Sequence, residues 1–435
     1  MLFQPHPDPN LRRHWYVTQI GLVLLPFSTL LGGVTLLINS FVLWAKYANQ
    51  LVQNLVNQVL LMLGVWMIII ALFAQYKGYS LPGLFNFLPF FIVFVAQSRL
   101  IESPQQLRRM AWLMVLPSIA IAVIGLGQLF WGWEFHLKLL TVENPNGADS
   151  DGIILDWLVH RGGRPEGRMS SLFYYATVLA SYFVTTFTLS LGLWIEAIFT
   201  RRSRGWQRWL SILGLGAIVA LDGVALFLTN SRNAWGIALA ACVLYAVYVG
   251  WRWVLGVVAW VVVAVLEAAY GPPPLRDWFR AIVPRIIWAR INDELFLDRP
   301  IASLRATQWK FAWSMIQQRP LTGWGLRNFT PMYEAAMNYY IGHPHNLPLM
   351  LAAEMGIPAT LIFYSLIGWV MFKGVMWLRE SGRSWDDHYA MFSIVLTFAA
   401  CSVFSLFDVP IFDARINLMG WLLLAGIWGV VLRKE

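Results

Sequence analysis

Long apolar runs recur along this chain, and they limit what it can fold into. The runs Leu60–Phe73 and Val254–Leu266 contain no charged residue and do not alternate between apolar and polar positions. A transmembrane barrel would need that alternation in strands of about 10 residues, whereas a helix needs about 20 apolar residues to cross a bilayer. The chain has 58% hydrophobic and only 13% charged residues, against about 25% charged in soluble domains. We therefore predict an all-α integral membrane protein.

Ten spans are predicted after residue 52, and the opening stretch is ambiguous. Trp15–Tyr47 is interrupted by Pro26, Gly32 and Gly33, so it could form one long helix or two short ones, and it is too long for a signal peptide. With two helices the chain is a single polytopic domain, residues 1–435, of about 12 transmembrane helices. The ten later spans are expected near residues 53–74, 82–98, 111–131, 172–195, 210–228, 234–250, 253–270, 347–372, 389–407 and 416–432.

The distribution of basic residues favours two opening helices. Lys and Arg in short loops prefer the cytoplasmic side, and a hairpin in the opening stretch places most of them on one side. The opposite short loops then hold only Lys77, Arg232 and Arg415. Both termini are therefore predicted to be cytoplasmic. The basic residues on that side are Arg12, Arg13, Lys46, Arg99, Arg108, Arg109, Arg201, Arg202, Arg204, Arg208, Arg252, Lys373, Arg379, Arg383, Arg433 and Lys434.

Two long segments, 132–171 and 271–346, fall on the side opposite the termini. In the second, Leu275, Trp278, Phe279, Ile282 and Val283 recur at helical spacing, which indicates an amphipathic helix on the membrane surface that ends at a proline. Another helix is expected over 302–318. The arginines on or near the first helix are expected to contact lipid phosphates, and these are Arg276, Arg280, Arg285 and Arg290.

Three polar motifs each precede a span that runs inward from this same side. They are Gly167-Arg168-Met169-Ser170-Ser171, Thr229-Asn230-Ser231-Arg232-Asn233 and His343-Pro344-His345-Asn346. A helix N-terminus presents unpaired N–H groups and attracts anions, and guanidinium groups bind phosphate oxygens through paired donors. Together these features suit the diphosphate head of a lipid. A histidine, which titrates near neutral pH, suits a general base.

Each motif also has a simpler interpretation when it is taken alone. Ser231 and Asn346 could serve only as helix N-caps. Arg168 and Arg232 could extend toward lipid headgroups, and a single histidine beside a proline is more often structural than catalytic. The coincidence of the motifs on one face favours a site. Two acids in spans, Asp222 and Glu267, are explained equally well by helix packing or by function.

At these residues the sequence resembles the O-antigen ligase and polymerase superfamily of bacterial envelope glycan enzymes. Residues 228–235, Leu-Thr-Asn-Ser-Arg-Asn-Ala-Trp, resemble its Ser-Arg-Gly-Ala signature. Residues 320–329 resemble its Pro-x-x-Gly-x-Gly-x-x-x-Phe turn, preceded by Arg305 and Trp309. Residues 343–346 and 354–358 resemble its His-x-His-Asn and Glu-x-Gly-x-Pro elements. Asn233 replaces the usual Gly, and residues 171–176 lack the Gly and Asn-Pro-Asn that commonly follow the first arginine.

The resemblance implies a metal-independent transfer, without cofactor, of a glycan from an undecaprenyl diphosphate-linked donor to an acceptor hydroxyl at the periplasmic face of the bacterial inner membrane. The acceptor would be lipid A core, as in lipopolysaccharide biosynthesis, or another glycan. Arg168, Arg232 and Arg305 would hold the diphosphate, with Arg232 also catalytic, and His345 would be the base. Orienting or structural roles are implied for Asn346, Glu354, Ser231 and His343.

Other functions remain open at this point. The same superfamily includes O-antigen polymerases and protein O-oligosaccharyltransferases, and some relatives have been associated with bicarbonate accumulation, so a small-solute transporter is the alternative of a different class. The net charge of +9 could suggest a nucleic-acid partner, but the basic residues lie between apolar runs and form no recognition motif, so none is predicted. The sequence carries no metal-ligand spacing and no nucleotide-binding loop. Both cysteines, Cys242 and Cys401, fall inside spans, so a disulfide is not expected.

Overall fold

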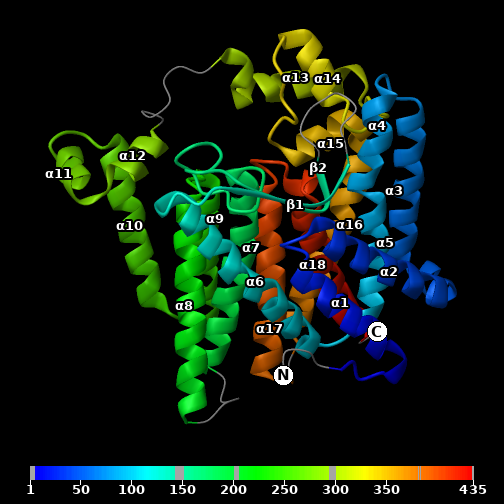
Figure 1. Ribbon diagram of the computed structural model, residues 1–435, viewed down its shortest axis with the longest axis horizontal. Coiled ribbons are helices and arrows are strands. Elements are labelled where there is room, and N and C mark those ends of the chain that lie inside the picture. The colour runs from blue at the N-terminus through cyan, green and yellow to red at the C-terminus, as the bar shows by residue number, and fades with distance from the viewer. Residues whose placement is uncertain are drawn as a thin grey trace.

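The computed structural model describes residues 5–142, 151–199, 205–292, 300–380, 382 and 384–433. They form a bundle of helices that run alternately up and down (Figure 1). Within these ranges, eleven helices are long and apolar enough to cross a membrane, so the protein is an all-α multi-pass membrane protein. The spans are α2 (Thr29–Val52), α3 (Leu55–Leu72), α4 with α5 (Lys77–Gly83 and Leu88–Leu100), α6 (Pro104–Phe130), α7 (Ala176–Phe199), α8 (Trp206–Leu228), α9 (Arg232–Val249), α10 (Arg252–Tyr270), α16 (Ile357–Leu378), α17 (Trp385–Phe404) and α18 (Ala414–Leu432).

The opening stretch forms two helices, which resolves the ambiguity of the sequence. A short turn, η1 (Pro9–Leu11), leads into α1 (Arg12–Leu24), and α1 packs against α2. The two helices approach so closely that a Cβ on Gly32 would lie 2.4 Å from Leu25 Cα. At 13 residues and about 1.5 Å per residue, α1 is too short to cross the roughly 30 Å hydrocarbon core. Eleven helices therefore have the length of a span, and α1 is the shorter arm of the opening hairpin, which leaves both described ends of the chain at the same end of the bundle (Figure 1).

One predicted span is interrupted in the structure. Instead of a single helix over 347–372, the chain forms α15 (Leu347–Met355) and then α16, with Gly356 between them at φ +83°. A Cβ at this glycine would lie 2.2 Å from the carbonyl oxygen of Leu321. The close approach of a distant loop requires a glycine here and stops α15 after nine residues.

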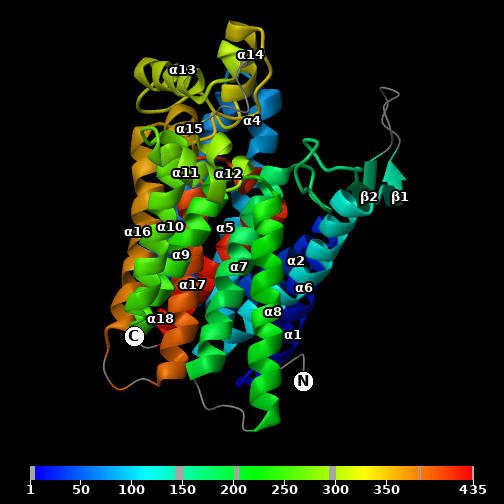
Figure 2. The same ribbon diagram turned by 90° about the vertical axis from the view of Figure 1, so that its left-hand side faces the viewer.

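The loops gather at one end of the bundle, and both described ends of the chain lie at the other (Figure 2). The loop end carries α11 (Leu275–Ile282), α12 (Arg285–Ile291), η3 (Ile301–Ser303), α13 (Arg305–Gln318) and α14 (Phe329–Met337). The two helices expected in 271–346 are thus present, although α13 begins three residues later than predicted. Of the basic residues used to predict the topology, Arg201, Arg202, Arg204, Arg383 and Lys434 lie outside the described residues.

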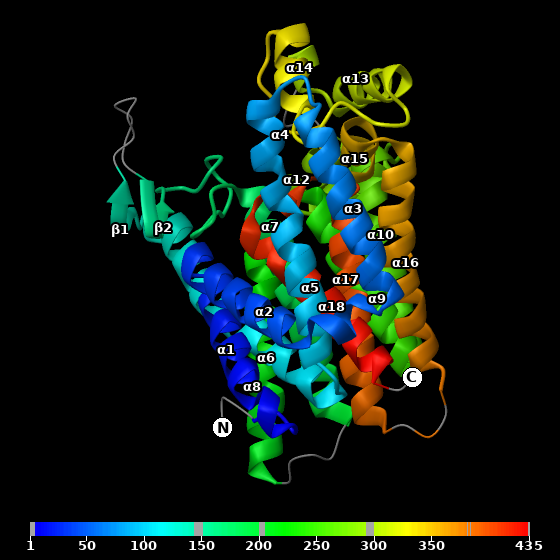
Figure 3. The ribbon, with the colours of Figure 1, turned by 90° about the vertical axis from the view of Figure 1, so that its right-hand side faces the viewer.

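Segment 132–171 contains a β-hairpin that the sequence analysis did not predict. Strands β1 (Phe135–Val142) and β2 (Asp151–Val159) pair antiparallel, with Phe135 opposite Val159. The hairpin projects beside the upper ends of α2 and α6 (Figure 3). Ser28, which caps α2 by accepting a hydrogen bond from Leu31 N, donates its own hydroxyl to Ile154 O in β2.

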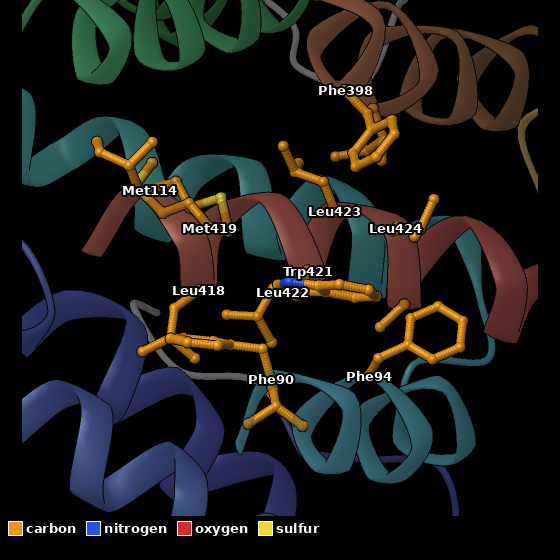
Figure 4. Close-up of a cluster of buried hydrophobic side chains, with 14 of the residues drawn as sticks. Phe90, Phe94, Met114, Phe398, Leu418, Met419, Trp421, Leu422, Leu423 and Leu424 are labelled. Carbon is orange, nitrogen blue, oxygen red and sulfur yellow. The ribbon is translucent and has the colours of Figure 1, made fainter. Parts of the chain in front are cut away.

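The core of the bundle is centred on α18, which packs against α5, α16 and α17. The indole of Trp421 makes edge contacts with Phe91, Phe94 and Phe363, with ring centroids 5.2 to 6.1 Å apart. Figure 4 shows Trp421 and its neighbours on α18 directed between the surrounding helices. Edge-to-face aromatic pairs of this kind stabilise packing in addition to the burial of apolar area, and α18 provides a rigid base for the loop that precedes it.

Candidate functional site

Two histidines and an aspartate meet at the loop end of the bundle. His345 Nδ1 lies 3.1 Å from Asp408 Oδ1, and His343 Nε2 lies 3.6 Å from the same oxygen. The histidines precede α15, and Asp408 lies between α17 and η4 (Pro410–Phe412). The two loops are joined by their backbones, because Leu347 N donates to Ser405 O at 2.9 Å. The position of the carboxylate beside the histidines is therefore fixed by main-chain contacts.

The hydrogen bonds of this cluster assign a proton to each ring. His343 Nδ1 accepts from the backbone N–H of His345 at 3.2 Å, so the proton of a neutral His343 lies on Nε2, facing Asp408. His345 Nδ1–H donates to Asp408, which leaves Nε2 of His345 with its lone pair. A carboxylate that holds an imidazole in one tautomer is the arrangement of an oriented general base.

Charges around the cluster reinforce this assignment. Burial lowers the pKa of His343 to about 3, with Asp408 opposing and with His345, Arg327 and Arg305 adding to the decrease. Burial alone would raise the pKa of Asp408, but the hydrogen bond from His345 and the charges of both histidines outweigh it and hold that pKa well below its usual value. At neutral pH His343 is therefore uncharged and Asp408 is ionised.

Asp408 is the residue that sequence reasoning missed. It carries no motif, and it follows directly after the predicted span 389–407. One signal was present, because that span runs toward the face on which the three motifs were placed. An acid at its outer end could have been proposed as a partner for the histidines on the same reasoning.

Arg168 lies against the second motif. Its Nε donates to Thr229 O at 2.8 Å, and the neighbouring Met169 N donates to Leu228 O at 2.9 Å. Burial lowers the pKa of Arg168, while Asp408 and Tyr175 act in the opposite direction. The influence of Asp408 places this guanidinium within electrostatic reach of the histidine cluster.

Arg305 approaches the cluster from α13. One turn later on the same helix, Trp309 Nε1 donates to Pro344 O at 2.9 Å, in the loop that carries both histidines. Residues four apart share a helix face, so Arg305 lies on the side of α13 that faces this loop. Its charge acts on His343 together with that of Arg327.

Arg232 is the first residue of α9, at the same end of the bundle. Its Nη1 donates to Arg290 O at 2.8 Å, at the C-terminal end of α12, where helix carbonyls attract cations. Arg232 lies three residues after Thr229, whose carbonyl accepts the hydrogen bond from Arg168. Ser231 occupies the expected N-cap position of α9, although its side chain makes no capping hydrogen bond.

Asn346 and Glu354 hold the backbone around the cluster. Asn346 Oδ1 caps α15 by accepting from Leu349 N at 2.9 Å, and its Nδ2 donates to Leu406 O at 3.0 Å. The buried carboxyl of Glu354 accepts from the backbone N–H groups of Phe329, at 3.2 Å, and Arg327. Burial raises the pKa of Glu354 to about 7, although these two bonds and the charge of Arg327 lower it.

The Gly-x-Gly turn and the Glu-x-Gly-x-Pro element are packed against each other. Trp324 N and Gly325 N donate to the carbonyls of Ala353 and Glu354, at 3.1 and 2.8 Å. Gly323, at φ +66°, lies so close that a Cβ would be 2.4 Å from the carbonyl carbon of Glu354. Two motifs about thirty residues apart thus form one packed unit at the C-terminal end of α15.

The cluster also has the composition of a metal site. The ligand atoms of His343, His345 and Asp408 all lie within 4.8 Å of one another. However, a histidine that binds a metal normally donates its other ring N–H to an acceptor, whereas His343 Nδ1 itself accepts from a backbone N–H. The observed hydrogen bonds therefore suit proton transfer better than metal ligation.

The other polar residues noted in the sequence have contacts of their own. Asp222 accepts from Ser118 at 2.7 Å and from Ser190 at 3.4 Å, which joins α8 to α6 and α7. The contacts of Asp222 support its helix-packing interpretation.

Arg280 donates to Ala268 O and lies 3.8 Å over the ring of Trp288. Part of its guanidinium is therefore engaged by the protein itself.

Comparison with known proteins bears on this site. Residues 215–364 match the family model described as O-antigen ligase, whereas no curated protein matches the sequence. The matched stretch contains Arg232, Arg305, both histidines and Glu354, and it excludes Arg168 and Asp408. The match supports an O-antigen ligase or polymerase type of membrane glycosyltransferase that acts on lipid-linked glycans. An O-antigen ligase segment is therefore identified at residues 215–364 of the chain.

Proposed function

We propose that this protein transfers a glycan from an undecaprenyl diphosphate-linked donor to an acceptor hydroxyl at the periplasmic face of the bacterial inner membrane. The observation that carries the proposal is the His345–Asp408 pair, which lies within electrostatic reach of Arg168 and next to the loop contacted by α13. The proposal places the loop end of the bundle at the periplasmic side of the membrane and both termini at the cytoplasmic side.

The chemistry requires one base and an anionic leaving group. His345 Nε2 takes the proton of the acceptor hydroxyl, and the freed oxygen attacks the anomeric carbon of the donor sugar. A new glycosidic bond forms as the bond between that carbon and the phosphate oxygen breaks, and the electron pair leaves with the lipid diphosphate. Asp408 stabilises the imidazolium that forms on His345.

The arginines would stabilise the departing diphosphate. Guanidinium groups keep their positive charge and form paired hydrogen bonds with phosphate oxygens, so Arg168, Arg232 and Arg305 are assigned to the leaving group. This division gives the cations to the diphosphate and the His–Asp pair to the hydroxyl. No step of the scheme uses a metal ion, which agrees with the hydrogen bonding of His343.

Transfer by the purified full-length chain tests the proposal. Proteoliposomes with an undecaprenyl diphosphate-linked glycan and a lipid A core acceptor should form the joined product, and His345→Ala or Arg232→Ala should nearly abolish it. Lys310→Gln, a change on the exposed face of α13, serves as the control. Undiminished turnover in both site variants would refute the proposal, and solute flux without lipid donor would favour transport.

Product analysis separates the members of the superfamily, because ligation, polymerisation and protein glycosylation share this chemistry. Deletion of the gene should remove long chains from the lipid core if the protein is a ligase. It should leave a single repeat if the protein is a polymerase. Orientation is tested by Lys310→Cys, which should react with a membrane-impermeant maleimide from the periplasmic side.

A further inference from the structure

A polar cavity of about 340 Å³ lies beneath the β-hairpin. Its walls are the hairpin, the turn between α1 and α2, and the segment 164–174. Three basic residues from separate parts of the chain line it, and they are Lys138 on β1, Arg164 and Arg415. Two carboxylates offset part of this charge. Asp156 binds His136 at 2.7 Å and lies opposite Lys138 in the hairpin, and Asp413 pairs with Arg415 at 2.6 Å. The three cations exceed the two carboxylates by one charge, so the lining favours an anionic ligand.

Aromatic rings hold two of these cations in place. The guanidinium of Arg164 lies 4.0 Å over Tyr174 and also donates to its hydroxyl at 2.7 Å. The guanidinium of Arg415 lies 3.8 Å over Phe173 and donates to Leu172 O at 3.1 Å. Stacked guanidinium groups are ordered before any ligand binds. Rings combined with a few fixed polar groups suit a saccharide that carries phosphate or carboxylate.

An apolar groove of about 390 Å³ continues from this cavity into the membrane region. The two share Thr29 and Leu30 at the start of α2. The groove runs between α2, α5 and α18, lined by residues such as Val34 and Leu418. Ala414 in the groove is next to Arg415 in the cavity. Together the two spaces have the form of an amphiphile, with a charged head and an apolar chain.

This site and the proposed diphosphate site lie on two sides of one segment. Arg164 lines the cavity, whereas Arg168, four residues later, binds the carbonyl of Thr229 at α8 and is influenced by Asp408. If the lipid diphosphate occupies the Arg168 side, the cavity is left for the second substrate. We infer that the cavity and the groove bind the acceptor as a membrane-anchored glycolipid with a negatively charged head. This inference rests on the proposed function.

Two substitutions test the two halves of the site separately. Arg164→Gln removes one cation from the cavity, and Arg161→Gln, an exposed arginine three residues earlier, is its control. Gly33→Leu fills the groove, because a Cβ at Gly33 has ordinary contact with Leu418 at 3.5 Å and the remaining atoms enter the space. Gly368→Leu, at an open position of α16 outside the groove, is the matched control.

The measurement is equilibrium binding of a radiolabelled phosphorylated lipid A core glycolipid to the purified full chain in detergent. Arg164→Gln and Gly33→Leu should each raise Kd at least about fivefold, with both controls at the wild-type value. The dephosphorylated glycolipid should bind the wild type more weakly. Size-exclusion profiles and melting temperatures verify that each variant is folded.

Several results would overturn the inference. They are an unchanged Kd in both variants, displacement of the probe by an equal concentration of phosphatidylglycerol, or an increased KM for the lipid-linked donor in place of the acceptor. The binding assay needs no turnover, so it separates the two hypotheses. If His345→Ala abolishes transfer while both variants bind the acceptor normally, only this inference fails. If the wild type catalyses no transfer but Arg164→Gln and Gly33→Leu lose binding of the glycolipid, only the proposed function fails.

Discussion

Asp408→Asn should isolate the charge of the His–Asp pair from its geometry. One oxygen of Asp408 accepts both from His345 Nδ1, at 3.1 Å, and from Val409 N, at 2.8 Å, and the amide oxygen of Asn can take the same place. The attraction between a carboxylate and an imidazolium at this distance is about 5 kcal/mol at an effective dielectric constant of about 20. Asp408 is 8% exposed, but 31% of the His345 side chain is accessible, so water screens part of this energy.

A loss of about 3 to 4 kcal/mol in the transition state follows, or roughly a 10²- to 10³-fold decrease in kcat. The KM for the lipid-linked donor should change little, because the base does not contact the diphosphate. The assay is initial-rate transfer of a fluorescent lipid-linked glycan by purified protein. Glu334→Gln, an exposed acid on α14, should retain wild-type kcat. If Asp408→Asn keeps more than one third of wild-type kcat while His345→Ala is inactive, the orienting role of Asp408 is wrong.

Three further outcomes are expected. Glu354→Gln keeps an acceptor for the N–H groups of Arg327 and Phe329. Because the pKa of Glu354 is raised to about 7 on folding, its ionisation destabilises the folded protein. The variant should therefore exceed the wild type in free energy of unfolding by up to about 3 kcal/mol at pH 8 and by little at pH 4.5. Because the pKa of His343 falls to about 3 on folding, the contribution of His343 to stability should decrease by up to about 1.4 kcal/mol per unit as pH falls below about 6.5, so His343→Gln should become more stable relative to the wild type as pH falls. Asn346→Ala should cost about 1 kcal/mol through the lost cap of α15. Melting temperatures in detergent across pH measure all three, with each variant compared with the wild type at the same pH because the effects of Glu354 and His343 oppose each other between about pH 4.5 and 6.5. A difference between His343→Gln and the wild type that does not change with pH, or a less stable Glu354→Gln at pH 8, would contradict the first two.

The helices and the shared face of the three motifs were predictable because they depend on local properties. Apolar runs set the spans, and helix direction then sets which loops meet. The break at Gly356 was not predictable, since its cause is a contact with Leu321 that no local pattern contains. The hairpin was also missed. Its two strands are neighbours in the sequence, but an irregularity beside Leu140 interrupts the alternation of β1.

The site itself divides in the same way. His345 and the arginines could be placed from motifs, because each motif sits at a helix end on one face. Asp408 carries no motif, and its position at the outer end of a span indicates only the face on which it lies. Its pairing with His345 depends on a distance that is set by main-chain bonds between the loops before α15 and after α17. The structure therefore adds the partner of the proposed base, whereas the sequence supplied the base.

The balance of charge in the cluster explains why two histidines would be useful where one acts as base. Asp408 has a single negative charge, and it would be shared if both rings were protonated. Because burial and the nearby Arg305 and Arg327 keep His343 neutral, the carboxylate is reserved for His345. When His345 gains the acceptor proton, the pair becomes neutral overall. The surrounding arginines then face only one uncompensated anion, which is the departing diphosphate, so proton uptake and leaving-group departure would be favoured by the same arrangement.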